Sequence, residues 1–309
     1  MDRTSGSART WLLLILALGC LLIAAGPTLV LSSAASRDRM VIKRDPSGAA
    51  MPVGDVPGWH QVFADNFARE NVPVGAFSGC RWPRRTPITR LNCRGLAAYP
   101  NVEAKWFAYP DGWTGTPSTG TYEPSKVISI HNGVMDYHLH TVGRSHMIAA
   151  AVPKIPGGSG LMGGFRYGRF VARARIAPLY GYHVSFLLWP DSNIWPRDRE
   201  IDFPEADFDS RTISGFVHWP GATGAARQTA YDVAVNLSRW HIYEVDWTAA
   251  GLSFYVDGVL IGRTTAPTEI PRTLMHWVLQ TGTSFTEGAP MSTASGDVQI
   301  DWVTAYRPE

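Results

Sequence analysis

Three carboxylates fall within six residues in the segment Glu200-Ile-Asp-Phe-Pro-Glu205. Acidic and apolar residues alternate over its first four positions, which is typical of a β-strand, where side chains two positions apart share a face. Glu205 would fall on the opposite face of a regular strand. One inserted residue, a β-bulge, restores it, and sheets tolerate proline mainly at bulges and edges. The segment therefore predicts that Glu200, Asp202 and Glu205 form a row on one concave face.

Such a row has the groups that glycoside hydrolysis requires. Carboxylates this close resist simultaneous ionisation, so we expect at least one raised pKa, as a proton donor needs. Retaining glycosidases use two carboxyl groups about 5–5.5 Å apart, one as nucleophile and one as acid and then base. The alternative from these six residues alone is a solvated acidic face or a set of calcium ligands.

The rest of the sequence predicts the β-strands that would position this row. Asn132-Gly133 and Asp257-Gly258 each separate two short apolar runs, which indicates two hairpins. Further alternating or apolar runs occur at 169–176, 183–189, 213–218, 240–247, 274–280 and 298–306. At least nine short strands without a helical rhythm predict an all-β antiparallel sandwich.

Several motifs along the chain resemble glycoside hydrolase family 16. Glu200 to Glu205 is similar to the family's bulged Glu-x-Asp-x-x-Glu signature. Four further stretches resemble strands that flank it in the family: Tyr167–Ile176, Phe186–Pro190 with Trp195-Pro196, Trp240–Gly258 and Val298–Tyr306. The resemblance covers roughly Phe63 to Tyr306, nearly all of the expected catalytic domain at 58–309.

The resemblance implies a jelly roll of the concanavalin A-like lectin and glucanase type, with an open cleft. It implies retaining, endo-acting hydrolysis of a polysaccharide, with a β-1,3- or β-1,3-1,4-glucan as the first choice of substrate. Glu200 would be the nucleophile, Glu205 the acid/base and Asp202 an assisting carboxylate. No cofactor is implied for catalysis. Asp301 resembles a residue that contributes to a structural calcium site in the family.

Two positions depart from the family pattern. The tryptophan expected in the Phe-Trp-Leu-Leu-Pro strand falls at Leu187, and a tryptophan occurs two residues later at Trp189. Pro204 stands where glucan-cleaving members more often have methionine. These differences leave the sugar open, but not the roles of the three acids.

Five residues are candidates for substrate binding. His218 and Trp219 end the strand that follows the acidic motif, where antiparallel pairing could place them beside the carboxylates. Trp195, Trp219 and Trp277 could stack on sugar rings, and the amide of Gln280 could bind sugar hydroxyls. The simpler alternative for each tryptophan is a place in the core.

The N-terminal region predicts export. Arg3 and Arg9 precede an apolar run, so residues 1–35 are expected to be a signal peptide or an uncleaved signal anchor, followed by a flexible linker at 36–57. Outside the cytoplasm, Cys80 and Cys93 are expected to pair, and closing that loop would stabilise the fold by about 3 kcal/mol. Two free thiols are the alternative.

Composition limits the partners. A formal net charge of +2, without a basic stripe, makes nucleic acid an improbable ligand. We expect a secreted monomer that binds a polysaccharide and meets a membrane only if the signal is uncleaved. A transglycosylase with the same carboxylates, or a non-catalytic carbohydrate-binding protein of the same fold, are the alternatives.

Overall fold

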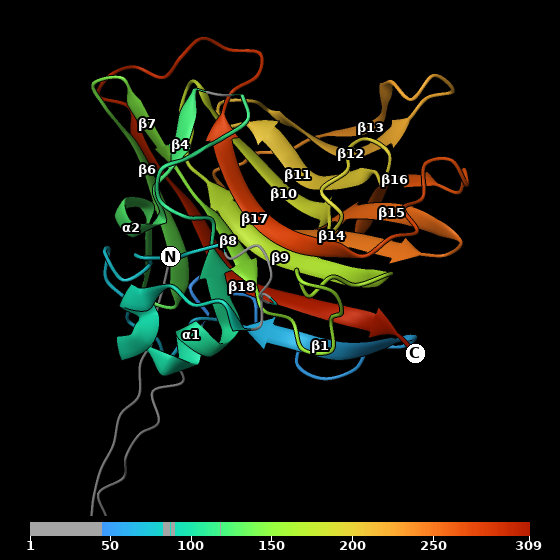
Figure 1. The fold of residues 1–309 in the computed structure, drawn as a ribbon, viewed down its shortest axis with the longest axis horizontal. Coiled ribbons are helices and arrows are strands. Elements are labelled where there is room, and N and C mark those ends of the chain that lie inside the picture. Colours follow the sequence, from blue (N-terminus) through green and yellow to red (C-terminus); the bar gives the residue numbers. More distant parts are fainter. Residues whose placement is uncertain (1–44, 83–86, 88–89, 118) are drawn as a thin grey trace, which may run out of the picture. The chain divides into compact units, whose positions relative to one another are not determined.

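The computed structural model describes residues 45–309 except 83–86, 88–89 and 118. Two β-sheets stack as layers, with β10, β11 and β17 in one layer and β9, β14 and β18 in the other (Figure 1). The all-β antiparallel sandwich predicted from the sequence is therefore confirmed. Within the described residues, no helix has the length and apolar character needed to cross a membrane.

The larger sheet has eleven strands in the order β16-β15-β14-β9-β18-β6-β7-β4-β3, with β1 paired to β18 and β5 to β6. Pairing is antiparallel except between β4 and β7. Its strands are β1 (Trp59–Asp65), β3 (Trp113–Thr114), β4 (Gly120–Tyr122), β5 (Ile128–His131), β6 (Val134–Val142), β7 (Ser145–Ile148), β9 (Gly168–Ile176), β14 (His241–Thr248), β15 (Gly251–Val256), β16 (Val259–Thr264) and β18 (Ser295–Pro308).

The smaller sheet has seven strands in the order β13-β12-β11-β10-β17-β8-β2. They are β2 (Trp106–Ala108), β8 (Ala150–Pro153), β10 (Tyr182–Pro190), β11 (Glu200–Asp207), β12 (Thr212–Pro220), β13 (Ala226–Ala234) and β17 (Met275–Thr283). The described helices are short: η2 (Arg94–Ala98), α1 (Pro100–Lys105) and α2 (Pro124–Val127). Both predicted hairpins and all six further predicted strands occur, with ends shifted by up to three residues.

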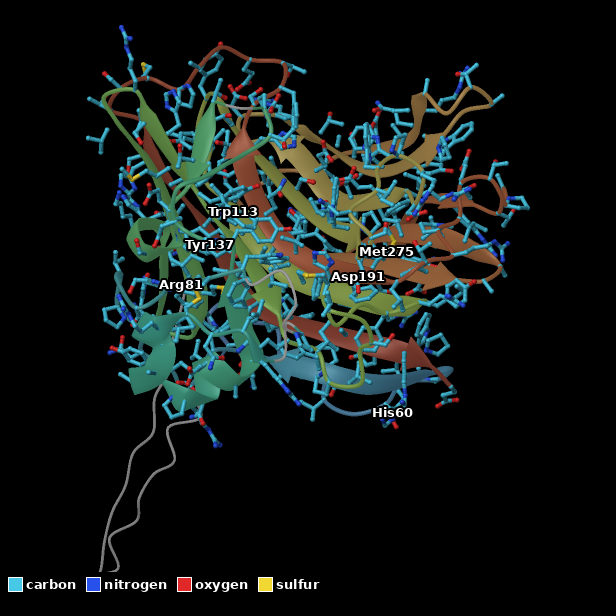
Figure 2. The ribbon with its side chains drawn as sticks, in the orientation of Figure 1. His60, Arg81, Trp113, Tyr137, Asp191 and Met275 are labelled. Carbon is cyan, nitrogen blue, oxygen red and sulfur yellow. A yellow bond between two sulfur atoms is a disulfide. The ribbon has the colours of Figure 1, made fainter. Side chains whose placement is uncertain are left out.

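The core lies between the two sheets. Ile213, Val217 and Val245 alternate with more exposed neighbours along β12 and β14, as one-sided burial requires. Tyr137 ties the layers together, since its hydroxyl donates to the carbonyl of Leu279 at 3.1 Å and accepts the N–H of Ala151 at 3.0 Å (Figure 2). β10 and β17 are buried along almost their whole length, because one face meets the core and the other lines the site.

The N-terminal predictions fall partly outside the described residues. The expected signal at 1–35 and the linker up to residue 44 lie there. Residues 45–57 contact the sandwich: the indole of Trp302 donates to the carbonyl of Ala49 at 3.1 Å, and Met51 and Val56 pack beside Trp302. This part of the expected linker therefore has apolar side chains that pack on the domain. Cys80 and Cys93 form a disulfide, as predicted.

Candidate active site

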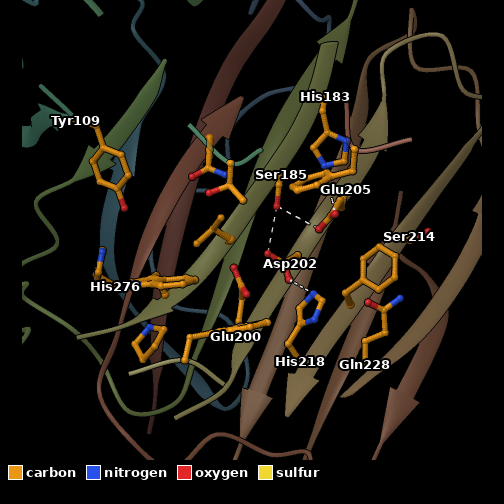
Figure 3. Close-up of a pocket in the computed structure, with 18 of the residues that line it drawn as sticks. Tyr109, His183, Ser185, Glu200, Asp202, Glu205, Ser214, His218, Gln228 and His276 are labelled. Carbon is orange, nitrogen blue, oxygen red and sulfur yellow. Dashed lines mark hydrogen bonds and ion pairs between the residues drawn. The ribbon is translucent and has the colours of Figure 1, made fainter. Parts of the chain in front are cut away.

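The acidic segment forms β11 and contains the predicted bulge. Asp202 pairs with Leu187 of β10 and Glu205 pairs with Ser185, so three positions of β11 match two positions of β10. The same irregularity occurs against β12, where the register also shifts between Asp202 and Glu205. The extra residue falls at Phe203-Pro204, and it returns Glu205 to the face of Glu200 and Asp202 (Figure 3).

Hydrogen bonds from the neighbouring strands hold these carboxylates. The hydroxyl of Ser185 lies 3.1 Å from Oδ1 of Asp202 and 3.3 Å from Oε2 of Glu205, so it bridges the two acids. On the other side, Nε2 of His218 lies at ion-pair distance, 3.2 Å, from Oδ2 of Asp202, an oxygen that accepts no hydrogen bond from the described residues. Asp202 is 2% exposed and sits between these two contacts, which fixes its orientation in the row.

Burial sets the protonation of this row. The pKa of Glu200 is raised well above its usual value, first by burial and then by the negative charge of Asp202. The pKa of Asp202 is also raised, by burial and by the charge of Glu205. The expectation that a carboxyl here holds a proton at neutral pH agrees with these shifts. Both shifts favour the protonated form of Glu200 and of Asp202, and the charge of one raises the cost of ionising the other.

A fourth carboxylate, Asp207, and a histidine, His183, extend the row beyond Glu205. His183 of β10 places Nε2 at 3.2 Å from Oε1 of Glu205 and Nδ1 at 3.0 Å from Oδ1 of Asp207. The sequence analysis missed these two residues. His183 and Ser185 alternate on a strand that was predicted, so strand parity placed them on one face, but only the register with β11 shows what that face meets.

A cleft of about 1440 Å³ runs across the carboxylates. Tyr109 and His276 lie on one side of them, and Ser214 and Gln228 on the other (Figure 3). The Tyr109 side is aromatic: its ring centroid lies 5.7 Å from that of Trp113, and Trp82 packs against both at 5.4 and 5.5 Å. Trp113 is 40% exposed, so its ring is available to a ligand.

Three of the five predicted substrate-binding residues line this cleft. Trp195 lies in the connection between β10 and β11, is 43% exposed, and places its ring 6.1 Å from that of His218. His218 is opposite Glu200 in the register of β12 and β11. Gln280 is opposite Ser185 in the register of β17 and β10, so both side chains share the cleft face.

The other two predicted residues point away from the cleft, and strand parity explains both errors. Trp277 is 4% exposed and packs on Phe170 in the core, because it lies an odd number of positions from Gln280. Trp219 follows His218 directly and therefore takes the opposite face of β12, where its indole donates to the hydroxyl of Thr229 at 3.4 Å. Residues an odd number of positions apart on a strand face opposite sides, so His218 and Trp219, or Trp277 and Gln280, could not both face the cleft.

Two places among the described residues have ligand groups suited to a metal. Glu200, Asp202 and His218 bring one ligand atom each within 4.8 Å of the others. At the predicted calcium position, Oδ2 of Asp301 accepts the N–H of Ser47 at 3.2 Å. The buried Oδ1 of Asp301 has no hydrogen-bond partner among the described residues, which leaves one oxygen that suits a cation. Calcium at Asp301 stays a prediction.

This two-sheet sandwich with a carboxylate-lined cleft defines a jelly roll of the glucanase type. Solved structures of this fold include LamAcat from Zobellia galactanivorans, with a TM-score of 0.59 and 15% identity over 80% of this chain and 97% of that one. The catalytic domain of an endo-1,3-beta-glucanase (laminarinase) from Thermotoga petrophila superposes with a TM-score of 0.56 at 19% identity, covering 83% of this chain and all of that one (100%).

Sequence comparison gives the family. Residues 154–304 match the profile of Glycosyl hydrolases family 16, and the chain belongs to this family. It is 25% identical over 224 residues to the endo-1,3-1,4-beta-glycanase ExsH of Rhizobium meliloti, covering 69% of this chain and 45% of that protein. A beta-glucanase of Rhodothermus marinus is 30% identical over 106 residues, covering 31% and 37%. The chain thus spans about half or less of these curated relatives.

Proposed function

We propose that this protein is a retaining, endo-acting glycoside hydrolase that cleaves internal β-linkages of a polysaccharide. The observation that carries the proposal is the bulged strand β11, which places Glu200, Asp202 and Glu205 side by side on the floor of an open cleft. An open cleft admits the middle of a chain, whereas a closed pocket would admit only its end. Family membership supports the same class of reaction.

Glu200 is the nucleophile in this proposal. Its carboxylate attacks the anomeric carbon while Glu205 donates its proton to the departing glycosidic oxygen, and a covalent glycosyl-enzyme forms. Water then attacks the anomeric carbon, Glu205 accepts a proton from it, and Glu200 is released as the carboxylate. Asp202 lies between the two glutamates and accepts the hydroxyl of Ser185, so it is placed to take up the proton that Glu200 loses before it attacks.

These roles give the cleft a direction. The acid/base lies beside the leaving group, so the released sugars occupy the Glu205 side, and the sugars retained on the enzyme occupy the Glu200 side. Burial, and to a smaller extent the negative charge of Glu200, raise the pKa of the Tyr109 phenol, so this phenol lies on the Glu200 side. The aromatic cluster of Trp82, Tyr109 and Trp113 therefore belongs to the retained, donor side.

A neutral β-1,3- or β-1,3-1,4-glucan is the proposed substrate. Relatives named for 1,3-1,4-β-glycanase and β-glucanase activity support this choice. The cleft lining supports it as well, because Asp191, Asp207 and Asp232 add negative charge to the three central acids while Arg227 is the one arginine among its described lining residues. This charge disfavours a sulfated or carboxylated chain.

A panel of polysaccharides scored for reducing ends tests the proposal. Wild type, Glu200→Ala and the control Glu70→Gln, an acid outside the cleft, are compared on laminarin, lichenan and other β-linked polymers. We expect activity in wild type and control and a loss of at least about 10³-fold in Glu200→Ala. Absence of wild-type activity on every β-linked polymer, or full activity of Glu200→Ala, contradicts the proposal.

Azide rescue separates the two glutamates. With an activated aryl glycoside, azide replaces the missing carboxylate of Glu200→Ala and attacks the anomeric carbon directly, which gives the inverted α-glycosyl azide. In Glu205→Ala, azide attacks the glycosyl-enzyme and gives the β-glycosyl azide. If Glu200→Ala gave the β-glycosyl azide and Glu205→Ala the α-glycosyl azide, Glu205 would be the nucleophile and Glu200 the acid/base. Products longer than the starting oligosaccharide would show that transglycosylation competes with hydrolysis.

We further propose that the protein acts as a monomer outside the cytoplasm. The disulfide between Cys80 and Cys93 supports this location, since such bonds persist in oxidising compartments. Fractionation of the producing cells and chromatography of the purified protein test the location and the monomer.

A further inference from the structure

His183 sits where the acid/base carboxyl is controlled. It lies on β10 opposite Asp207, two positions from the residue opposite Glu205, so all three side chains occupy the cleft face. Its Nε2 is 3.2 Å from Oε1 of Glu205, and its Nδ1 is 3.0 Å from Oδ1 of Asp207. The contact of Nδ1 with Asp207 is a hydrogen bond, whereas Nε2 lies at ion-pair distance from Glu205 without hydrogen-bond geometry, so this second contact is attractive when the ring carries its positive charge.

The surroundings keep this histidine in place. His183 is 7% exposed, and the ring of Phe285 meets its ring edge-on with centroids 5.1 Å apart. The hydroxyl of Thr286 donates to Oδ2 of Asp207 at 2.6 Å, so the carboxylate that anchors His183 is itself fixed. The hydroxyl of Ser185 donates to Oε2 of Glu205, so one oxygen of the acid/base accepts a hydrogen bond and the other faces the ring of His183.

Resting on the function proposed above, we propose that His183, anchored by Asp207, is a positioning residue for Glu205. Its imidazolium holds the carboxyl group toward the cleft and stabilises the carboxylate that accepts a proton from water in the second step. Glu200 attacks and Glu205 transfers the proton, so His183 takes part through Glu205 and forms no bond to substrate.

The charges around His183 agree with a permanent imidazolium. Burial alone would lower its pKa, but the hydrogen bond with Asp207 and the negative charges of Glu205 and Asp207 outweigh burial and raise the pKa to about 9. Asp202 of β11 also faces His183, and the positive charge of His183 lowers the pKa of Asp202. From the segment before β18, Phe285 and Thr286 bring no charge, and Glu287 lies close enough to Asp207 for the charge of Asp207 to contribute to the raised pKa of Glu287. The net field at His183 is negative.

The pH profile of kcat/KM on the best glucan of the panel is the first test. His183→Gln keeps a donor toward Glu205 but removes the positive charge, so protonated Glu205 persists to higher pH. We expect the basic limb to move up by about one pH unit and kcat at low pH to fall, because the base form is lost there. His146→Gln is the matched control: His146 is 8% exposed and lies outside the cleft. An unmoved basic limb overturns the inference.

A double-mutant cycle and NMR complete the test. In Glu205→Ala rescued by azide, His183→Gln should add less than about 2-fold, since its partner is gone. If His183 had a purely structural role, His183→Gln would lower the rate of wild type and the azide-rescued rate of Glu205→Ala by the same factor. Nitrogen-15 NMR of His183 at pH 7 should show an imidazolium in wild type and in Glu200→Ala. A neutral ring overturns the inference even if the protein cleaves no glucan, which separates this failure from failure of the proposed function.

Discussion

Asp202→Asn should stabilise the fold while it disables the enzyme. Asp202 is 2% exposed, and burial and the charge of Glu205 raise its pKa. Since its pKa is higher in the folded than in the unfolded protein, its contribution to stability is full below the unfolded value and is lost as pH rises through the folded value. Asparagine keeps the shape and the bond from Ser185 and carries no charge, so the variant escapes this loss.

The magnitude follows from the cost of keeping this carboxyl protonated at a pH where it ionises in the unfolded chain, which is about 1.4 kcal/mol for each pH unit above the unfolded pKa. Relief of this cost is worth about 1–3 kcal/mol, and about 1 kcal/mol moves Tm by about 2–4 °C in a domain near this size. We expect the Tm of Asp202→Asn to exceed that of wild type by a few degrees at pH 8 and to match it at pH 4. Activity should fall by about 10²-fold or more, because an asparagine between Glu200 and Glu205 cannot take up a proton or carry a negative charge.

Thermal unfolding followed from pH 4 to pH 8 measures this effect, with kcat measured on the same preparations. Asp111→Asn, an exposed aspartate outside the cleft, is the control and should show no pH-dependent difference. A variant less stable than wild type at pH 8, or a Tm difference that is constant over pH, would refute the argument from burial.

Three further predictions concern other parts of the molecule. Trp113→Ala should lower kcat/KM roughly 2- to 10-fold on long oligosaccharides and leave kcat/KM on the shortest substrates unchanged. The control Trp240→Ala removes a surface ring under Arg175 and should not change kcat/KM at any substrate length. Equal losses at all lengths in Trp113→Ala would contradict a distal donor site. Cys93→Ser should lower the free energy of unfolding in urea by about 3 kcal/mol, and reductant should do the same to wild type only; unchanged stability would mean that the bridge adds nothing. Added Ca²⁺ should raise the Tm of wild type but not of Asp301→Asn, and a Tm indifferent to Ca²⁺ and chelator would leave Asp301 with its bond to Ser47 alone.

Strand parity carried most of what the sequence could predict. It placed the carboxylates on one face, and it required the bulge that the register of β11 confirms. The same rule, applied to neighbours, would have corrected two errors: Trp219 follows His218, and Trp277 lies three positions before Gln280, so each tryptophan had to face away from its partner's side.

The site residues that the sequence did not predict are those whose position depends on the register between strands. His183 and Asp207 are 24 positions apart, and no local pattern states that they are opposite each other. The aromatic wall is harder still, because Trp82, Tyr109 and Trp113 come from the first half of the chain and reach the cleft only through the order of strands in the sheets.

Because of the bulge in β11, the function of the site depends on the number of residues between Asp202 and Glu205 more than on which residues they are. A substitution at Pro204 changes one side chain, which is consistent with the family's use of methionine there. Deletion of one residue between Asp202 and Glu205 would instead exchange the faces of everything that follows: Glu205 and Asp207 would turn toward the core, and Ala206 toward the cleft. Deletion of a single codon in this segment would therefore abolish activity while leaving all three acids in the sequence.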